Sequence, residues 1–145
     1  MKGLIQRVKH ASVTIDNATV GKIDLGLLLL LGIERNDDKA TANKLLDKVL
    51  NYRVFNDDNG KINLGLKSIG GGLLIVSQFT LVADTKKGLR PGFSAGATPE
   101  ESEALYHYFI SRAKQLHSNV ATGCFGANMG VLLLNDGPVT FMLRC

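Results

Sequence analysis

Residues 131–143 read VLLLNDGPVTFML, a polar segment held between two apolar runs. The pair Asp136-Gly137 is a strong hairpin signal, so the plain interpretation is two strands joined by a turn. Pro138 fits that interpretation poorly, because proline has no N–H to donate to a sheet and opens a strand only at an edge, at a bulge or after a special turn. A Gly-Pro bond can also be cis, and a cis proline in a folded protein usually has a purpose.

Apolar patterning predicts further strands around this segment, in a single domain covering residues 1–145. The leucine-rich run at 25–33 is far shorter than the ~20 residues that cross a bilayer, so it predicts a buried central strand. Other strands are expected at 4–8, 12–15, 52–55 and 73–83, the last being the longest. The order of elements predicts an α/β fold with a mostly antiparallel sheet and two main helices packed on it.

The two helices have recognisable starts. The acidic run 36–38 offers N-caps for a helix whose apolar residues recur at helical spacing between 42 and 50. Thr98 can cap the second helix, Pro99 suits its first position, and Glu101 completes a capping box with Thr98.

The composition is that of a globular protein, with 45% hydrophobic and 21% charged residues. The net charge of +4 permits a polyanionic partner such as RNA without requiring one. Cys124 and Cys145 have no metal-binding spacing and are expected to be free thiols. The N-terminal residues lack the pattern of a signal peptide, so a cytoplasmic location is expected.

Conventional catalytic sets are scarce in this chain. There is no G-x-S-x-G elbow and no phosphate-binding loop, and the histidines at 10, 107 and 117 are expected to be mainly structural or solvated. One segment is unusual, because Ser77, Gln78 and Thr80 interrupt an apolar run at 75–82. On a continuous strand, Ser77 and Phe79 would share one face and Gln78 and Thr80 the other. These polar groups either bond to neighbouring backbone or form the edge of a site for a polar ligand.

Taken together, the segments 77–81 (SQFTL) and 135–140 (NDGPVT) resemble the two signature motifs of the D-aminoacyl-tRNA deacylase family. The resemblance extends through segments at 4–8, 26–32, 52–55, 61–64, 83–84, 89–91, 104–106, 122–123 and 125–127. It implies a homodimer with a barrel-like α/β fold that hydrolyses the ester joining a D-amino acid, or glycine, to the terminal adenosine of tRNA. It implies aminoacylated tRNA as the partner, no metal or organic cofactor, and neither membrane nor DNA binding.

The resemblance also implies roles for individual residues. Gly137 and Pro138 would form a cis pair that reaches into the partner subunit's site, where its carbonyl groups leave no room for an L side chain. N–H groups around Gln78, Phe79 and Thr80 would hold the developing oxyanion, and the terminal 2′-hydroxyl of tRNA would position or activate water. The implied catalytic set is Ser77, Gln78, Phe79 and Thr80. The implied substrate-binding set is Gly137, Pro138, Phe79 beside the adenine, Arg7 as a brace of the Gly-Pro element, Met129 and Asn135. The expected tRNA contacts are Lys86, Lys87 and Arg90.

Two alternatives stay open at this point. A non-catalytic RNA-binding module could share the fold, although both signature motifs are intact. A general esterase could use Thr80 as its nucleophile, but a threonine hydroxyl is weak without an adjacent base and neither motif contains a histidine or lysine.

Overall fold

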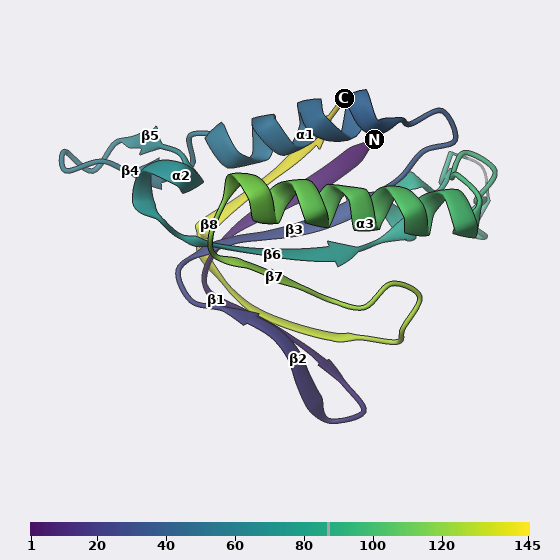
Figure 1. Ribbon diagram of the computed structural model, residues 1–145, viewed down its shortest axis with the longest axis horizontal. Coiled ribbons are helices and arrows are strands. Elements are labelled where there is room, and N and C mark those ends of the chain that lie inside the picture. Colours follow the sequence, from purple (N-terminus) through teal and green to yellow (C-terminus); the bar gives the residue numbers. More distant parts are fainter. Residues whose placement is uncertain (87) are drawn as a thin grey trace.

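The computed structural model describes residues 1–86 and 88–145, in which six strands form one sheet (Figure 1). The strands of this sheet are β1 (Lys2–Ile15), β2 (Ala18–Ile23), β3 (Gly26–Gly32), β6 (Gly72–Ser77), β7 (Val120–Thr122) and β8 (Gly130–Arg144). A second, two-stranded sheet contains β4 (Phe55–Asn56) and β5 (Ile62–Leu64). The helices are α1 (Lys39–Asn51), α2 (Leu66–Ile69), the 3₁₀ helix η1 (Phe79–Val82) and α3 (Pro99–Leu116).

The large sheet is mixed and nearly closes into a barrel. Its order is β2-β1-β3-β6-β7, with β8 paired to the other side of β1. The pairs of β1 with β2, β3 and β8 are antiparallel, whereas β3–β6 and β6–β7 are parallel. The outer strands β2 and β7 meet closely, since a Cβ atom on Gly21 would lie 2.4 Å from the carbonyl oxygen of Thr122. The predicted barrel-like α/β fold, with mostly antiparallel pairing, is confirmed.

The helices α1 and α3 lie side by side over one face of the sheet (Figure 1). Their apolar faces are buried there, as the periodicity predicted. The buried helical residues are Ala42, Leu45, Leu46, Val49 and Leu50 from α1 and Leu105, Tyr106, Phe109 and Ala113 from α3. Both predicted helix starts are confirmed: the Asp38 carboxylate accepts a hydrogen bond from the N–H of Thr41 at 2.7 Å, and Thr98 and Glu101 form the capping box.

The leucine-rich run forms the central strand β3 and is buried on both faces. Leu27, Leu29 and Leu31 pack under the helices, while Leu28 joins a second core inside the barrel with Leu74 and other residues. Parallel pairing with β6 requires a long crossover, which α1 provides. A strand covered on both sides needs continuous rather than alternating hydrophobicity, which explains the run.

The predicted strand at 73–83 is wrong in its second half. β6 ends at Ser77, and the N–H of Gln78 donates to the carbonyl of Leu31 at 2.8 Å. The chain then turns into η1, where the N–H of Leu81 donates to the carbonyl of Gln78. The predicted alternation of faces from Ser77 to Thr80 is therefore wrong as well. The expected strands at 4–8 and 12–15 are parts of the single strand β1, and of 52–55 only Phe55 belongs to a strand.

The hairpin interpretation of residues 131–143 is also wrong, because both halves of this segment belong to β8 and pair with β1. Val8 pairs with Asn135 and Gln6 with Thr140, so the single residue Arg7 faces the four residues 136–139. The strand continues in the same direction and forms a large bulge there. Of the helices in the described ranges, none has the length and apolarity needed to cross a membrane.

Candidate active site

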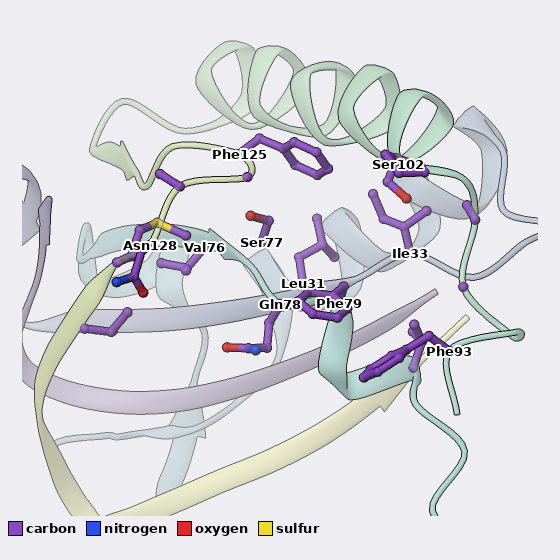
Figure 2. Close-up of a pocket in the computed structure, with 18 residues that line it drawn as sticks. Leu31, Ile33, Val76, Ser77, Gln78, Phe79, Phe93, Ser102, Phe125 and Asn128 are labelled. Carbon is purple, nitrogen blue, oxygen red and sulfur yellow. The ribbon is translucent and has the colours of Figure 1, made fainter. Parts of the chain in front are cut away.

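A pocket of about 650 Å³ lies at the end of β6, where this strand meets η1, the loop before α3 and the loop after β7. Figure 2 shows Phe79 and Phe93 next to each other on one side, with Phe125 and Ser102 across the pocket from them. The lining residues are Leu31, Ile33, Val76, Ser77, Gln78, Phe79, Val82, Phe93, Gly96, Ala97, Pro99, Ser102, Phe125, Gly126, Ala127, Asn128, Met129 and Val131.

The described residues that line this pocket include no histidine and no charged side chain. Ser77 contributes a hydroxyl that points into the pocket, and Gln78, Ser102 and Asn128 contribute the other polar side chains (Figure 2). Such groups donate and accept hydrogen bonds but do not take up a proton near neutral pH. These side chains can bind and orient a polar ligand, and none of the described lining side chains is a proton acceptor near neutral pH.

Two backbone N–H groups near the lining residues have no partner inside a helix. Phe79 and Thr80 occupy the first turn of η1, where N–H groups have no partner inside the helix. The N–H of Gln78 is different, because it donates to the carbonyl of Leu31. Among the three predicted oxyanion donors, Phe79 and Thr80 are thus available, and Gln78 is engaged by the sheet.

The Thr80 side chain is exposed and is not one of the described pocket-lining groups. Its Oγ1 accepts a hydrogen bond from the Gln78 side-chain amide at 2.6 Å. An amide nitrogen in this role donates a proton and cannot remove one, so this contact does not activate the hydroxyl as a nucleophile.

A second group of predicted residues surrounds the bulge of β8. The bond between Gly137 and Pro138 is cis, as the resemblance implied. Arg7 Nε donates to the carbonyl of Asp136 at 3.0 Å, and Arg7 Nη1 donates to the buried carbonyl of Val54 at 2.7 Å. Asn135 bridges the two ends of the bulge, because its Oδ1 accepts a hydrogen bond from the N–H of Val139 at 3.0 Å.

The structure thus divides the predicted site residues into two groups. Ser77, Gln78, Phe79 and Met129 line the pocket, and Thr80 follows Phe79 in η1 without being one of the described lining residues. The described residues Arg7, Asn135, Gly137 and Pro138 lie at the bulge and do not line the same chain's pocket.

The predicted basic contacts lie in the loop after η1. Lys86 and Arg90 are exposed there, and Lys87 lies outside the described residues. The histidines are elsewhere: His107 is exposed beside Glu103, and the buried His117 ring contacts the carbonyl of Gly71. Within residues 1–86 and 88–145, no cluster of histidine, cysteine and carboxylate side chains could hold a metal ion.

The lining residues that had no assigned site role from the sequence include Phe93, Ser102, Phe125 and Asn128. Phe125 falls within a segment that carried the family resemblance, and Phe93 is the aromatic residue of the segment 84–97. Both signals were present, but only the tertiary structure brings the two side chains to one pocket.

Comparison with known proteins identifies the family of this chain. The family model for D-Tyr-tRNA(Tyr) deacylase matches residues 4–144. Proteins named D-aminoacyl-tRNA deacylase from Stutzerimonas stutzeri (strain A1501) and Pseudoalteromonas translucida (strain TAC 125) are 63% and 60% identical, each match covering 99% of both chains. A solved structure titled "c-Myc DNA Unwinding Element Binding Protein" superposes with a TM-score of 0.96 at 36% identity, covering 100% of this chain and 99% of the other. The chain therefore belongs to the D-Tyr-tRNA(Tyr) deacylase family.

Proposed function

We propose that this chain hydrolyses the ester bond of D-aminoacyl-tRNA and releases the free D-amino acid and tRNA. The same reaction would remove glycine mischarged on tRNA(Ala). Family membership over residues 4–144 and relatives of matching length named D-aminoacyl-tRNA deacylase support the reaction class.

The observation that carries the mechanism is a pocket with hydrogen-bond donors but no titratable side chain among its described lining residues. Ester hydrolysis begins when water attacks the carbonyl carbon and negative charge develops on the carbonyl oxygen. The N–H groups of Phe79 and Thr80 are free to hold that oxygen. Removing one such donor from an oxyanion site slows catalysis by roughly 10²–10³-fold, so backbone groups supply a large share of the acceleration.

The remaining requirement is a group that positions or activates the water. The described lining residues provide no base, whereas the terminal ribose of tRNA carries a 2′-hydroxyl next to the ester. In this proposal that hydroxyl orients the attacking water, and the leaving ribose oxygen takes the proton. Phe79, whose side chain is 65% exposed at the pocket, provides a face against which the terminal adenine packs.

The Gly137–Pro138 bulge would select the chirality of the substrate from a second copy of the chain. Within the described residues of one chain, the bulge and the pocket are separate, so a bulge that acts on a pocket has to belong to a partner. Two features of β8 support such a dimer. β8 pairs with β1 alone among the described strands, which leaves its second edge without a partner strand. Its exposed apolar residues are Leu132, Leu134, Phe141 and Met142.

A backbone wall suits discrimination between mirror images. D and L substrates carry the same chemical groups, so attraction separates them poorly and exclusion is needed. Carbonyl groups of the bulge would accept hydrogen bonds from the substrate's amino group and occupy the space of an L side chain. Glycine, which has no side chain, would still enter.

Two further expectations from the sequence stay predictions. One is that Lys86, Lys87 and Arg90 contact tRNA phosphates, and the other is that the protein is located in the cytoplasm.

The decisive experiment compares the hydrolysis of D-tyrosyl-tRNA and L-tyrosyl-tRNA by the wild-type chain, with glycyl-tRNA(Ala) as a third substrate. We expect rapid release of D-tyrosine and glycine and little release of L-tyrosine. Equal rates on both tyrosyl enantiomers would reject chirality selection. Tight tRNA binding without ester cleavage would instead favour a non-catalytic RNA-binding protein.

A further inference from the structure

Phe93 lies directly against Phe79 at the pocket. The two ring centroids are 5.1 Å apart, and the ring planes are tilted by 49° (Figure 2). Phe93 is 45% exposed and Phe79 65% exposed, although both line the pocket. Two aromatic rings left open to solvent on a pocket wall present apolar surface that a ligand can cover.

The loop that carries Phe93 is held in place by several backbone contacts. Asp84 and Gly92 exchange a pair of hydrogen bonds, in which N···O distances are 2.7 and 2.9 Å. On the other side of Phe93, Arg35 donates from its guanidinium to the carbonyl of Ser94 at 2.7 Å and from its N–H to the carbonyl of Ala95 at 3.1 Å. These hydrogen bonds on both sides of Phe93 hold its backbone in place beside Phe79.

We propose that Phe93 is a second base-binding residue, which holds the terminal adenine of tRNA together with Phe79. This inference rests on the proposed function, because it assigns a contact for the substrate of that same pocket. Stacking of a base on an aromatic side chain is the usual way in which proteins hold single-stranded nucleotides, and it tolerates different bases because each has a flat π face.

The spacing of the rings determines how a base binds there. A base sandwiched between two rings requires ring planes about 7 Å apart, twice the ~3.5 Å contact distance of carbon atoms. The observed 5.1 Å is too short for that arrangement. The base therefore lies on the angled surface that the two rings form, with its face on one ring and its edge on the other.

The test uses Phe93→Ala, Phe93→Leu and Phe93→Tyr, with Leu89→Ala as the control from the same loop. Leu89 is fully exposed and is not among the residues that line the pocket. Affinity is measured for a non-hydrolysable amide analogue of D-tyrosyl-adenosine and for the same analogue lacking the base. KM and kcat are measured with D-tyrosyl-tRNA, and thermal melts check that each variant folds.

We expect Phe93→Ala to bind the adenosine analogue about 5- to 140-fold more weakly. Stacking a base on an aromatic ring contributes ~1–3 kcal/mol, and each ~1.4 kcal/mol changes the dissociation constant tenfold. KM should rise while kcat changes little. Phe93→Tyr should retain binding, Phe93→Leu should be intermediate, and Leu89→Ala should resemble wild type. The base-free analogue should bind equally to wild type and Phe93→Ala.

Unchanged binding of the adenosine analogue by a folded Phe93→Ala or Phe93→Leu variant would overturn the proposal. So would an equal loss of binding for the base-free analogue, which would indicate a general change in the pocket. Failure of the proposed function would give a different result, namely that the wild-type chain does not hydrolyse D-tyrosyl-tRNA.

Discussion

Arg7 on β1 and Asp136 on β8 are joined by two contacts across the bulge. Arg7 Nε donates to the carbonyl oxygen of Asp136 at 3.0 Å and lies 3.2 Å from its carboxylate oxygen Oδ2. Arg7 is only 8% exposed and also bonds the carbonyl of Val54. A single buried guanidinium therefore connects the Gly137–Pro138 bulge to the segment after α1.

Replacing Arg7 with leucine should lower the free energy of unfolding by about 2–3 kcal/mol, because hydrogen bonds from a charged donor are lost and a buried carbonyl loses its partner. Urea unfolding measures this change. Lys9→Ala is the matched control, since Lys9 also approaches Asp136, at 4.0 Å, but is 64% exposed. That variant should lose less than about 1 kcal/mol. Equal effects of the two substitutions would contradict the bracing role of Arg7.

Alanine at Gly26 should disrupt the parallel pairing of β3 with β6. A Cβ atom at this position would lie 1.9 Å from the carbonyl oxygen of Gly72, and backbone cannot yield there without breaking the sheet. We expect a loss of roughly 3 kcal/mol or more in the free energy of unfolding. Gly92→Ala is the control, because its nearest neighbour would be 3.9 Å away and its stability should change by less than about 0.5 kcal/mol. A stable Gly26→Ala variant would be inconsistent with this packing.

Two substitutions at Thr80 distinguish the contribution of its side chain to catalysis from the contribution of its backbone N–H group. Thr80→Val removes only the hydroxyl and should reduce kcat by less than about tenfold, whereas Thr80→Pro also removes the N–H and should reduce kcat by roughly 10²–10³-fold. Single-turnover hydrolysis of D-tyrosyl-tRNA is the measurement, and circular dichroism checks the fold. Complete inactivity of a folded Thr80→Val variant would restore the nucleophile hypothesis.

Changing the substrate tests the role assigned to tRNA. A D-tyrosyl-tRNA whose terminal ribose carries hydrogen in place of the 2′-hydroxyl should be hydrolysed roughly 10²-fold or more slowly, the usual contribution of a group that assists proton transfer. The binding of this substrate, measured by competition, should change far less than its rate. Undiminished turnover would exclude the 2′-hydroxyl from the reaction.

The Tyr106 phenol should make stability sensitive to alkaline pH. Burial raises the pKa of Tyr106 from 10.0 to about 12, the charge of Cys124 adds to the increase, and a hydrogen bond from the Ser77 backbone opposes it. A raised pKa in the folded state contributes stability that is present below pH 10 and is lost as the pH rises toward about 12. Urea unfolding across this range should show that Tyr106→Phe removes part of the alkaline loss. An unchanged pH profile would contradict the assignment.

Local sequence was sufficient for the parts of the fold that depend on local bonds. The run 36–38, in which Asp38 is the cap, and Thr98 predicted both helix starts, because a capping side chain bonds backbone two or three residues away. The leucine run predicted a buried central strand, which β3 is. The same reasoning failed after Ser77, where the apolar pattern continues to Val82 but the ladder with β3 ends. Strand length depends on the partner strand, which local patterning does not contain.

The sequence by itself determined the two long helices, the central strand and, through two motifs, the family to which the chain belongs. Only the tertiary structure decided that residues 131–143 form a bulged strand, because Gly130–Arg144 pairs along β1 from a distance of over a hundred residues. It also brought Phe93 and Phe125 to the pocket of Ser77 and separated that pocket from the Gly137–Pro138 bulge. Such groupings arise from long-range pairing and packing, whose free energies outweigh the local turn preference of an Asp-Gly pair.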